Sequence, residues 1–186
     1  MEKNQTRRQY VLALGAVSAM GLAGCSERDP TSDGTRTIAT ESGPTDTVTN
    51  ILQPASTVGI VDGERINTVE VTVQRAPDNG DIDLSQTSVE WNGPSGSYDL
   101  TSESVTGGDG SFAVTSVEDD DESIAERSTL NADGDQAMLT IDLTALGRAL
   151  DAGVSATVGL TTPSGGSTEI RLVVPKKLSG QDTVGL

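Results

Sequence analysis

Short runs in which apolar and polar residues alternate constrain the fold of this chain most. Between Asn67 and Gln74 three valines, at 69, 71 and 73, alternate with polar residues, and the same period returns in the later runs 137–143, 156–161 and 170–174. Such a period places the apolar side chains on one face of a β-strand. Turn residues separate the runs, as in 77–81 and 163–166. Many short strands joined by turns predict an all-β fold, an antiparallel β-sandwich.

A hairpin is predicted in the middle of the chain. Ser88–Trp91 and Ser97–Leu100 flank the turn-forming sequence Asn-Gly-Pro-Ser-Gly at 92–96. Trp91 and Tyr98 are expected to lie across this hairpin from each other and to pack there, as cross-strand aromatic pairs do.

The other expected elements are short. A strand is predicted at 112–115, followed by the charge run 118–122, which is interpreted as a solvated loop. Thr144–Leu150 is the segment with helical character, with Asp142 or Thr144 as its N-cap.

An apolar segment near the N-terminus has the layout of an export signal. A basic pair, Arg7 and Arg8, precedes an apolar run of about fourteen residues that ends before a single cysteine. A membrane-spanning helix needs about twenty apolar residues, so the run is too short to span. The pair and the following Tyr10-Val11-Leu12 resemble a twin-arginine signal, and Leu22-Ala23-Gly24-Cys25 resembles a lipobox. Residues 1–24 are therefore predicted to be a cleaved signal, with Cys25 as the lipid attachment site.

The segment after Cys25 is poor in apolar residues. Ser26 to Thr49 is made mainly of Ser, Thr, Asp, Gly and Pro. Such a sequence cannot bury enough apolar surface to offset its ordering entropy. Residues 25–49 are predicted to be a flexible, lipidated spacer, and 50–186 a folded domain.

The chain is strongly acidic. It carries 28 acidic and 12 basic side chains, a formal net charge of −16. This charge disfavours nucleic acid and anionic lipid surfaces as partners, because both carry the same sign. Concentrated salt screens the self-repulsion, so the composition indicates a halophilic protein; an ordinary acidic extracellular protein is the alternative.

The composition also argues against an enzyme. The chain has no histidine, and its one cysteine is assigned to lipid. These absences remove the usual general base near neutral pH and the thiol nucleophile. No spacing typical of a nucleophile and its base or of a phosphate loop is found, so a non-catalytic protein without a small-molecule substrate is predicted.

One loop has the composition of a weak calcium site. Asn131, Asp133 and Asp135 alternate around Gly134, which would let their oxygens converge on Ca²⁺. The loop lacks the distal bidentate Glu of an EF-hand, and a solvated turn is the alternative. No other cofactor is expected.

Several segments, in order along the chain, resemble the globular C-terminal domain of archaellins, the filament subunits of the archaeal flagellum. They are 57–61, 66–77, 81–85, 130–137, 161–171 and 174–180. The resemblance implies an immunoglobulin-like β-sandwich behind a twin-arginine lipoprotein signal of haloarchaeal type. It also implies a structural role in, or accessory to, the archaeal flagellum and cell motility.

The N-terminus departs from that family. Archaellins begin with a long hydrophobic helix that builds the filament core, whereas the apolar run here ends at Cys25. Two roles therefore stay open at the extracellular face of the membrane. The chain is a component or accessory of the archaellum, or it is a lipid-anchored module that docks the surface-layer protein or a small ligand.

Overall fold

The computed structural model describes residues 50–108 and 110–186. The predicted export signal with Arg7 and Arg8, the lipid attachment site Cys25 and the predicted spacer lie outside the described residues.

Short strands make up most of the described chain. In order they are β1 (Leu52–Asp62), β2 (Arg65–Arg75), β3 (Ile82–Asp83), β4 (Ser88–Gly93), β5 (Gly96–Ser102), β6 (Ser111–Glu118), β7 (Thr129–Leu130), β8 (Gln136–Asp142), β9 (Leu150–Asp151), β10 (Ser155–Thr161), β11 (Ser167–Val173) and β12 (Thr183–Gly185). A short 3-10 helix, η1 (Leu84–Gln86), and the helix α1 (Ser123–Arg127) complete the set.

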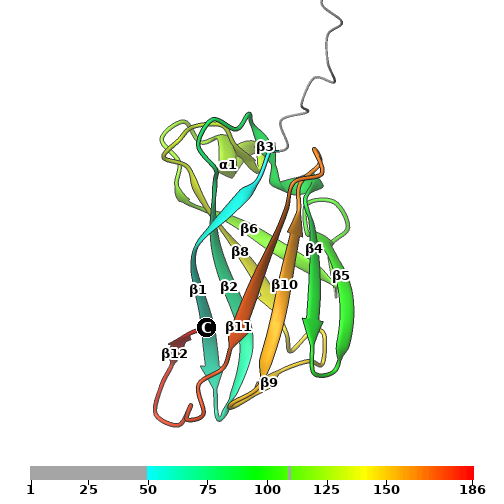
Figure 1. The fold of residues 1–186 in the computed structure, drawn as a ribbon, viewed down its shortest axis with the longest axis vertical. Coiled ribbons are helices and arrows are strands. Elements are labelled where there is room, and N and C mark those ends of the chain that lie inside the picture. The colour runs from blue at the N-terminus through cyan, green and yellow to red at the C-terminus, as the bar shows by residue number, and fades with distance from the viewer. Residues whose placement is uncertain (1–49, 109) are drawn as a thin grey trace, which may run out of the picture. The chain divides into compact units, whose positions relative to one another are not determined.

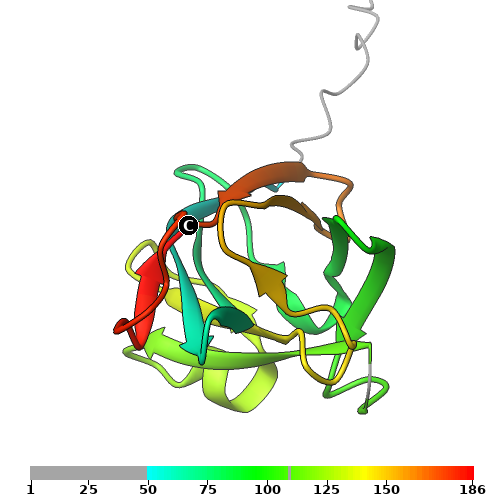
Figure 2. The ribbon, with the colours of Figure 1, turned by 90° about the horizontal axis from the view of Figure 1, so that it is seen from below.

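Ten of the described strands form one curled sheet with the order β11-β10-β4-β5-β6-β8-β2-β1-β12, in which β9 pairs with β2. The other two, β3 and β7, form a separate antiparallel pair. Figure 2 shows, from one end, how the sheet curls until its halves face each other. The halves join where Thr101 and Ser102 of β5 pair in parallel with Ser111 and Phe112 of β6. The predicted all-β, sandwich-like fold is confirmed, and this parallel pairing is the exception to its antiparallel order.

The pair β2 and β8 forms the centre of one half. Val69 lies opposite Ile141 and Val71 opposite Leu139, and all four side chains are buried. The polar residues between them point to the other face, as the period of two requires. The valine alternation predicted a half-buried strand, and β2 confirms it.

The facing half places an aromatic residue at its centre. Trp91 of β4 lies opposite Tyr98 of β5 on one side and opposite Val158 of β10 on the other. Trp91 is buried and Tyr98 packs against the same core. The predicted hairpin and its cross-strand pair are confirmed.

The helical segment lies elsewhere than predicted. Thr144–Leu150 is predicted to be helical, but residues 143–147 form turns and Leu150 begins β9. In the turns, Asp142 accepts from the backbone N–H groups of Thr144 and Ala145 at 2.8 and 3.1 Å. The helix is α1, which directly follows the charge run 118–122. A helix this short shows no apolar period, so the sequence gives no periodic signal for it. No helix within 50–108 and 110–186 has the length and apolarity to span a membrane.

The end of the sandwich that carries α1 and β3 also receives the start of the described chain (Figure 1). The Asn50 side chain accepts from Gly80 N at 3.0 Å and donates to Asp81 O at 3.1 Å. Its backbone N–H donates to Ser164 Oγ, and its carbonyl accepts from Thr162 Oγ1 at 2.7 Å. Asn50, the first described residue, is therefore held in place by hydrogen bonds from both its side chain and its backbone.

We expect Gly166→Ala to destabilise the fold at this entry point. A Cβ on Gly166 would lie 2.0 Å from the carbonyl oxygen of Asn50, and overpacking of this kind costs about 1–3 kcal/mol. Thermal unfolding followed by circular dichroism measures the loss. Gly134→Ala is the matched control, because a Cβ there meets nothing within 4 Å. Equal unfolding midpoints for the two variants would contradict the close packing of Gly166 against the Asn50 carbonyl.

Candidate functional site

Three carboxylates meet beside α1. Asp119 and Asp121 come from the loop after β6, and Asp135 comes from the loop between β7 and β8. One carboxylate oxygen from each lies within 4.8 Å of the others. In the sequence, Asp119 and Asp121 belong to the acidic run 118–122, whose main interpretation is a solvated face with ion binding as the lesser alternative. The run itself does not indicate which of its side chains point inward.

The predicted set Asn131, Asp133 and Asp135 does not converge. Asp133 is 85% exposed and pairs with Arg75 at 2.5 Å, away from the three-carboxylate cluster. Asn131 reaches the cluster from the side and donates to Asp121 Oδ2 at 2.7 Å. Asp135 is turned inward and is only 2% exposed. The calcium ligand set expected from the sequence stays a prediction, and binding through Asp133 would require its ion pair with Arg75 to open.

The carboxylates of this cluster are already used by the protein. Asp135 Oδ2 accepts from the backbone N–H groups of Asn131 and Ala132, both at 2.8 Å. Asp119 Oδ2 accepts from the backbone N–H groups of Ile124 and Ala125, both at 3.0 Å. Calcium takes six to eight oxygens, and these bonds occupy lone pairs that a cation would need. The arrangement braces two loops and α1 against each other.

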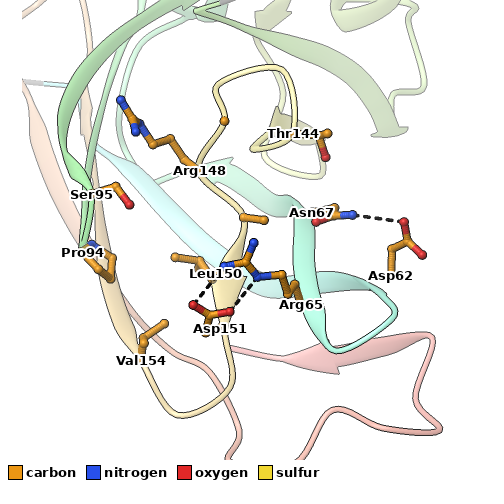
Figure 3. A pocket seen from close by; sticks show the side chains of 12 residues that line it. Asp62, Arg65, Asn67, Pro94, Ser95, Thr144, Arg148, Leu150, Asp151 and Val154 are labelled. Atoms are coloured by element: carbon orange, nitrogen blue, oxygen red, sulfur yellow. Dashed lines mark hydrogen bonds and ion pairs between the residues drawn. The ribbon is translucent and has the colours of Figure 1, made fainter.

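A hollow of about 430 Å³ lies at the opposite end of the sandwich. Figure 3 shows the Arg65–Asp151 pair and the Asn67–Asp62 hydrogen bond at the start of β2, with Arg148 extending away from them. Arg65 meets the Asp151 carboxylate through two nitrogens, at 2.6 and 3.1 Å. No sequence pattern groups Arg65 with Asp151, because the two residues lie 86 positions apart along the chain.

We expect Asp135→Ala to lower the free energy of unfolding by about 1–3 kcal/mol, because it leaves two backbone N–H groups without their acceptor. Asp133→Ala is the matched control; the Asp133 side chain is 85% exposed although its partner Arg75 is only 14% exposed, and we expect loss of this ion pair to cost about 1 kcal/mol. Denaturant unfolding of both variants measures the difference. Equal losses, together with a calcium-dependent rise of the wild-type midpoint, would instead indicate the calcium site expected from the sequence.

Asp121 should make stability depend on pH. Hydrogen bonds, first from the Asn131 side chain and then from Ser123, hold the pKa of Asp121 below its ordinary value of 3.8. A lowered pKa in the folded state stabilises the protein above the unfolded pKa, and this contribution is lost as the pH falls through the folded value. Asp121→Asn and Asn131→Ala should each flatten the fall of the melting temperature below about pH 4. An unchanged acid slope in both variants would contradict the assignment.

Comparisons with known proteins agree on one kind of relative. No protein-family model matches the chain. The sequence is 28% identical over 159 residues to Flagellin A2 of Haloferax volcanii, covering 72% of this chain and 71% of that protein.

Solved structures share the fold. The archaeal flagellin FlaB1 from Methanocaldococcus jannaschii superposes with a TM-score of 0.65 at 16% identity, covering 74% of this chain and 96% of that chain. The archaeal flagellum of Methanospirillum hungatei strain JF1 gives a TM-score of 0.50 at 17% identity, covering 69% of this chain and 67% of that chain. The chain is therefore similar in sequence to an archaeal flagellin and shares the fold of archaeal flagellin structures.

Proposed function

We propose that the chain is a structural, non-catalytic protein of the archaeal cell surface that forms part of the archaellum or acts as its accessory in motility. The observation that carries this proposal is the sequence similarity to Flagellin A2 over most of both chains. The fold shared with FlaB1 supports it.

The chemistry of the described surface supports a structural role. The acidic cluster beside α1 holds loops through backbone N–H groups. The full sequence has no histidine to act as a general base near neutral pH. The carboxylates of this cluster therefore stabilise the loops of the domain itself.

The entry of the chain also supports a load-bearing role. Asn50 is bonded both to the loop before β3 and to the turn between β10 and β11, through Asp81 and Ser164. Thr168 Oγ1 adds a bond of 2.6 Å to the carbonyl of Leu52. A pull on the segment before Asn50 would be shared between two parts of the domain instead of peeling β1 away.

The proposal includes attachment to the extracellular face of the membrane. Arg7 and Arg8 direct export by the twin-arginine route, and Cys25 carries lipid after the signal is removed. A lipid chain anchors because each buried methylene contributes about 0.8 kcal/mol. An acidic chain of net charge −16 is suited to the concentrated salt outside a halophilic cell.

A second candidate is a lipid-anchored binding module that docks the surface-layer protein or a small ligand. The observation that favours it is the apolar run, which ends at Cys25 instead of continuing as a long hydrophobic helix. An anchored module needs no filament core.

Fractionation of cells that make the protein separates the two candidates. We expect the chain to be recovered with sheared archaella, or with the motor complexes that remain attached to membranes. Recovery from detergent-extracted membranes without any archaellum protein would favour the anchored module.

Cys25→Ser tests the lipid attachment in the same cells. The variant should be released into the medium, whereas Ser26→Ala, which keeps the thiol, should stay with the membrane. Retention of both variants would contradict the lipid attachment and leave the archaellum assignment to be judged from the fractions.

A further inference from the structure

The hollow at the end of the sandwich opposite Asn50 contains an arginine without a carboxylate partner. Among residues 50–108 and 110–186, the ion pairs are Arg65–Asp151 and Arg75–Asp133. Arg148 lines the hollow and takes part in neither pair. The chain has a net charge of −16, so most of its surface repels anions. A partly buried guanidinium that no carboxylate neutralises is a position where an anionic ligand can bind favourably.

The position of Arg148 is fixed by its surroundings. Its backbone N–H donates to the Leu143 carbonyl at 2.7 Å. Its guanidinium lies over the ring of Tyr98, 4.7 Å from the centroid, and its Nε is buried without a hydrogen-bond partner. A guanidinium stacked on an aromatic ring keeps its plane, and a fixed plane suits recognition of a carboxylate through two N–H groups.

The other polar groups of the hollow suit hydroxyl groups. Asn67 Nδ2 donates to Asp62 Oδ2 at 3.2 Å, and Arg65 and Asp151 form a second fixed pair. Each pair combines N–H donors with carboxylate acceptors that have free lone pairs, so each can donate to and accept from neighbouring hydroxyls. These groups are exposed or partly exposed, within reach of a ligand.

The hollow also has an apolar side and a continuation. Pro94, Leu150 and Val154 contribute aliphatic carbon to its lining, as the C–H face of a sugar ring requires. A second hollow of about 630 Å³ shares Asp62, Arg65 and Asp151 with the first and adds Lys176 and Lys177 to the lining. The two together extend beyond a single ring and offer further positive charge.

We propose that this pair of hollows binds an acidic carbohydrate whose sugar units carry a carboxylate, that is, a uronic acid. The carboxylate of one sugar unit lies on Arg148, and hydroxyls of neighbouring units lie on the Arg65–Asp151 and Asp62–Asn67 pairs, from which Arg148 extends away (Figure 3). The next unit extends toward Lys176 and Lys177. This inference does not depend on whether the chain belongs to a filament or is anchored beside one.

Calorimetric titration of the full chain with trigalacturonic acid tests the proposal. We expect saturable binding with a Kd near or below about 1 mM. The trimethyl ester of the same sugar, which lacks the charges, should bind at least about tenfold more weakly, since charge-assisted hydrogen bonds to arginine are lost.

Substitutions place the ligand in the hollow. Arg148→Gln should weaken binding about tenfold, and Arg148→Lys should fall between it and the wild type, because lysine keeps the charge but not the planar fork. Arg127→Gln is the matched control, since Arg127 is an exposed arginine of α1 at the other end. Asn67→Ala is a second variant that leaves the Arg148–Tyr98 stack intact, and it should weaken both the acid and its ester. Thermal unfolding checks that each variant is folded.

Each other outcome overturns the proposal. Absence of saturable binding to trigalacturonic acid removes the site. Equal binding of triglutamic acid shows that hydroxyl recognition plays no part and rejects the carbohydrate. Equal weakening by Arg127→Gln and Arg148→Gln shows that net charge, not the hollow, attracts the ligand.

Discussion

The alternation of apolar side chains along β2, β8, β4 and β10 is the constraint on which the rest of the structure depends. Each strand buries one row, and the rows of the two halves meet in one core cluster. The full sequence holds a single cysteine, so no internal disulfide reinforces this packing. The halves join along the chain at the short parallel pairing of β5 and β6. On the other side, bonds from Asn50 and Thr168 close the curl.

Much of this fold could be predicted from the sequence. Apolar residues at every second position can be read from a few neighbouring residues, and they indicate a β-strand with one buried face. The strands β2, β8, β10 and β11 and the β4–β5 hairpin lie where the alternation placed them. The helix was misplaced, since Thr144–Leu150 has helix-forming residues but closes as turns around Asp142. The acidic loop was predicted only in part. Spacing indicated that Asp133 and Asp135 are near each other. The direction of Asp133 is decided by Arg75, which lies elsewhere in the chain, and that of Asp135 by the backbone N–H groups of Asn131 and Ala132 in its own loop.

The described domain is polarised along its length. One end carries α1 and β3, and the other carries β9 and the turn between β4 and β5 (Figure 1). The acidic cluster and Asn50 belong to the first end. The two hollows with Arg65, Arg148, Lys176 and Lys177 belong to the second. The sequence did not indicate this separation, because the basic residues involved are scattered from β2 to the segment before β12. Under the proposed function, the end that carries Asn50 would transmit load to the attachment, and the other end would be free to contact a partner.

The central claim is that this archaellin-like domain works in or beside the archaellum at the cell surface. Immunogold electron microscopy of intact, unpermeabilised cells, with antibody raised against the purified full chain, tests it most directly. The account predicts gold along archaella or clustered where they leave the cell, with none on a strain that lacks the gene. Gold spread evenly over the surface without relation to archaella, or seen only after the cells are opened, would contradict it.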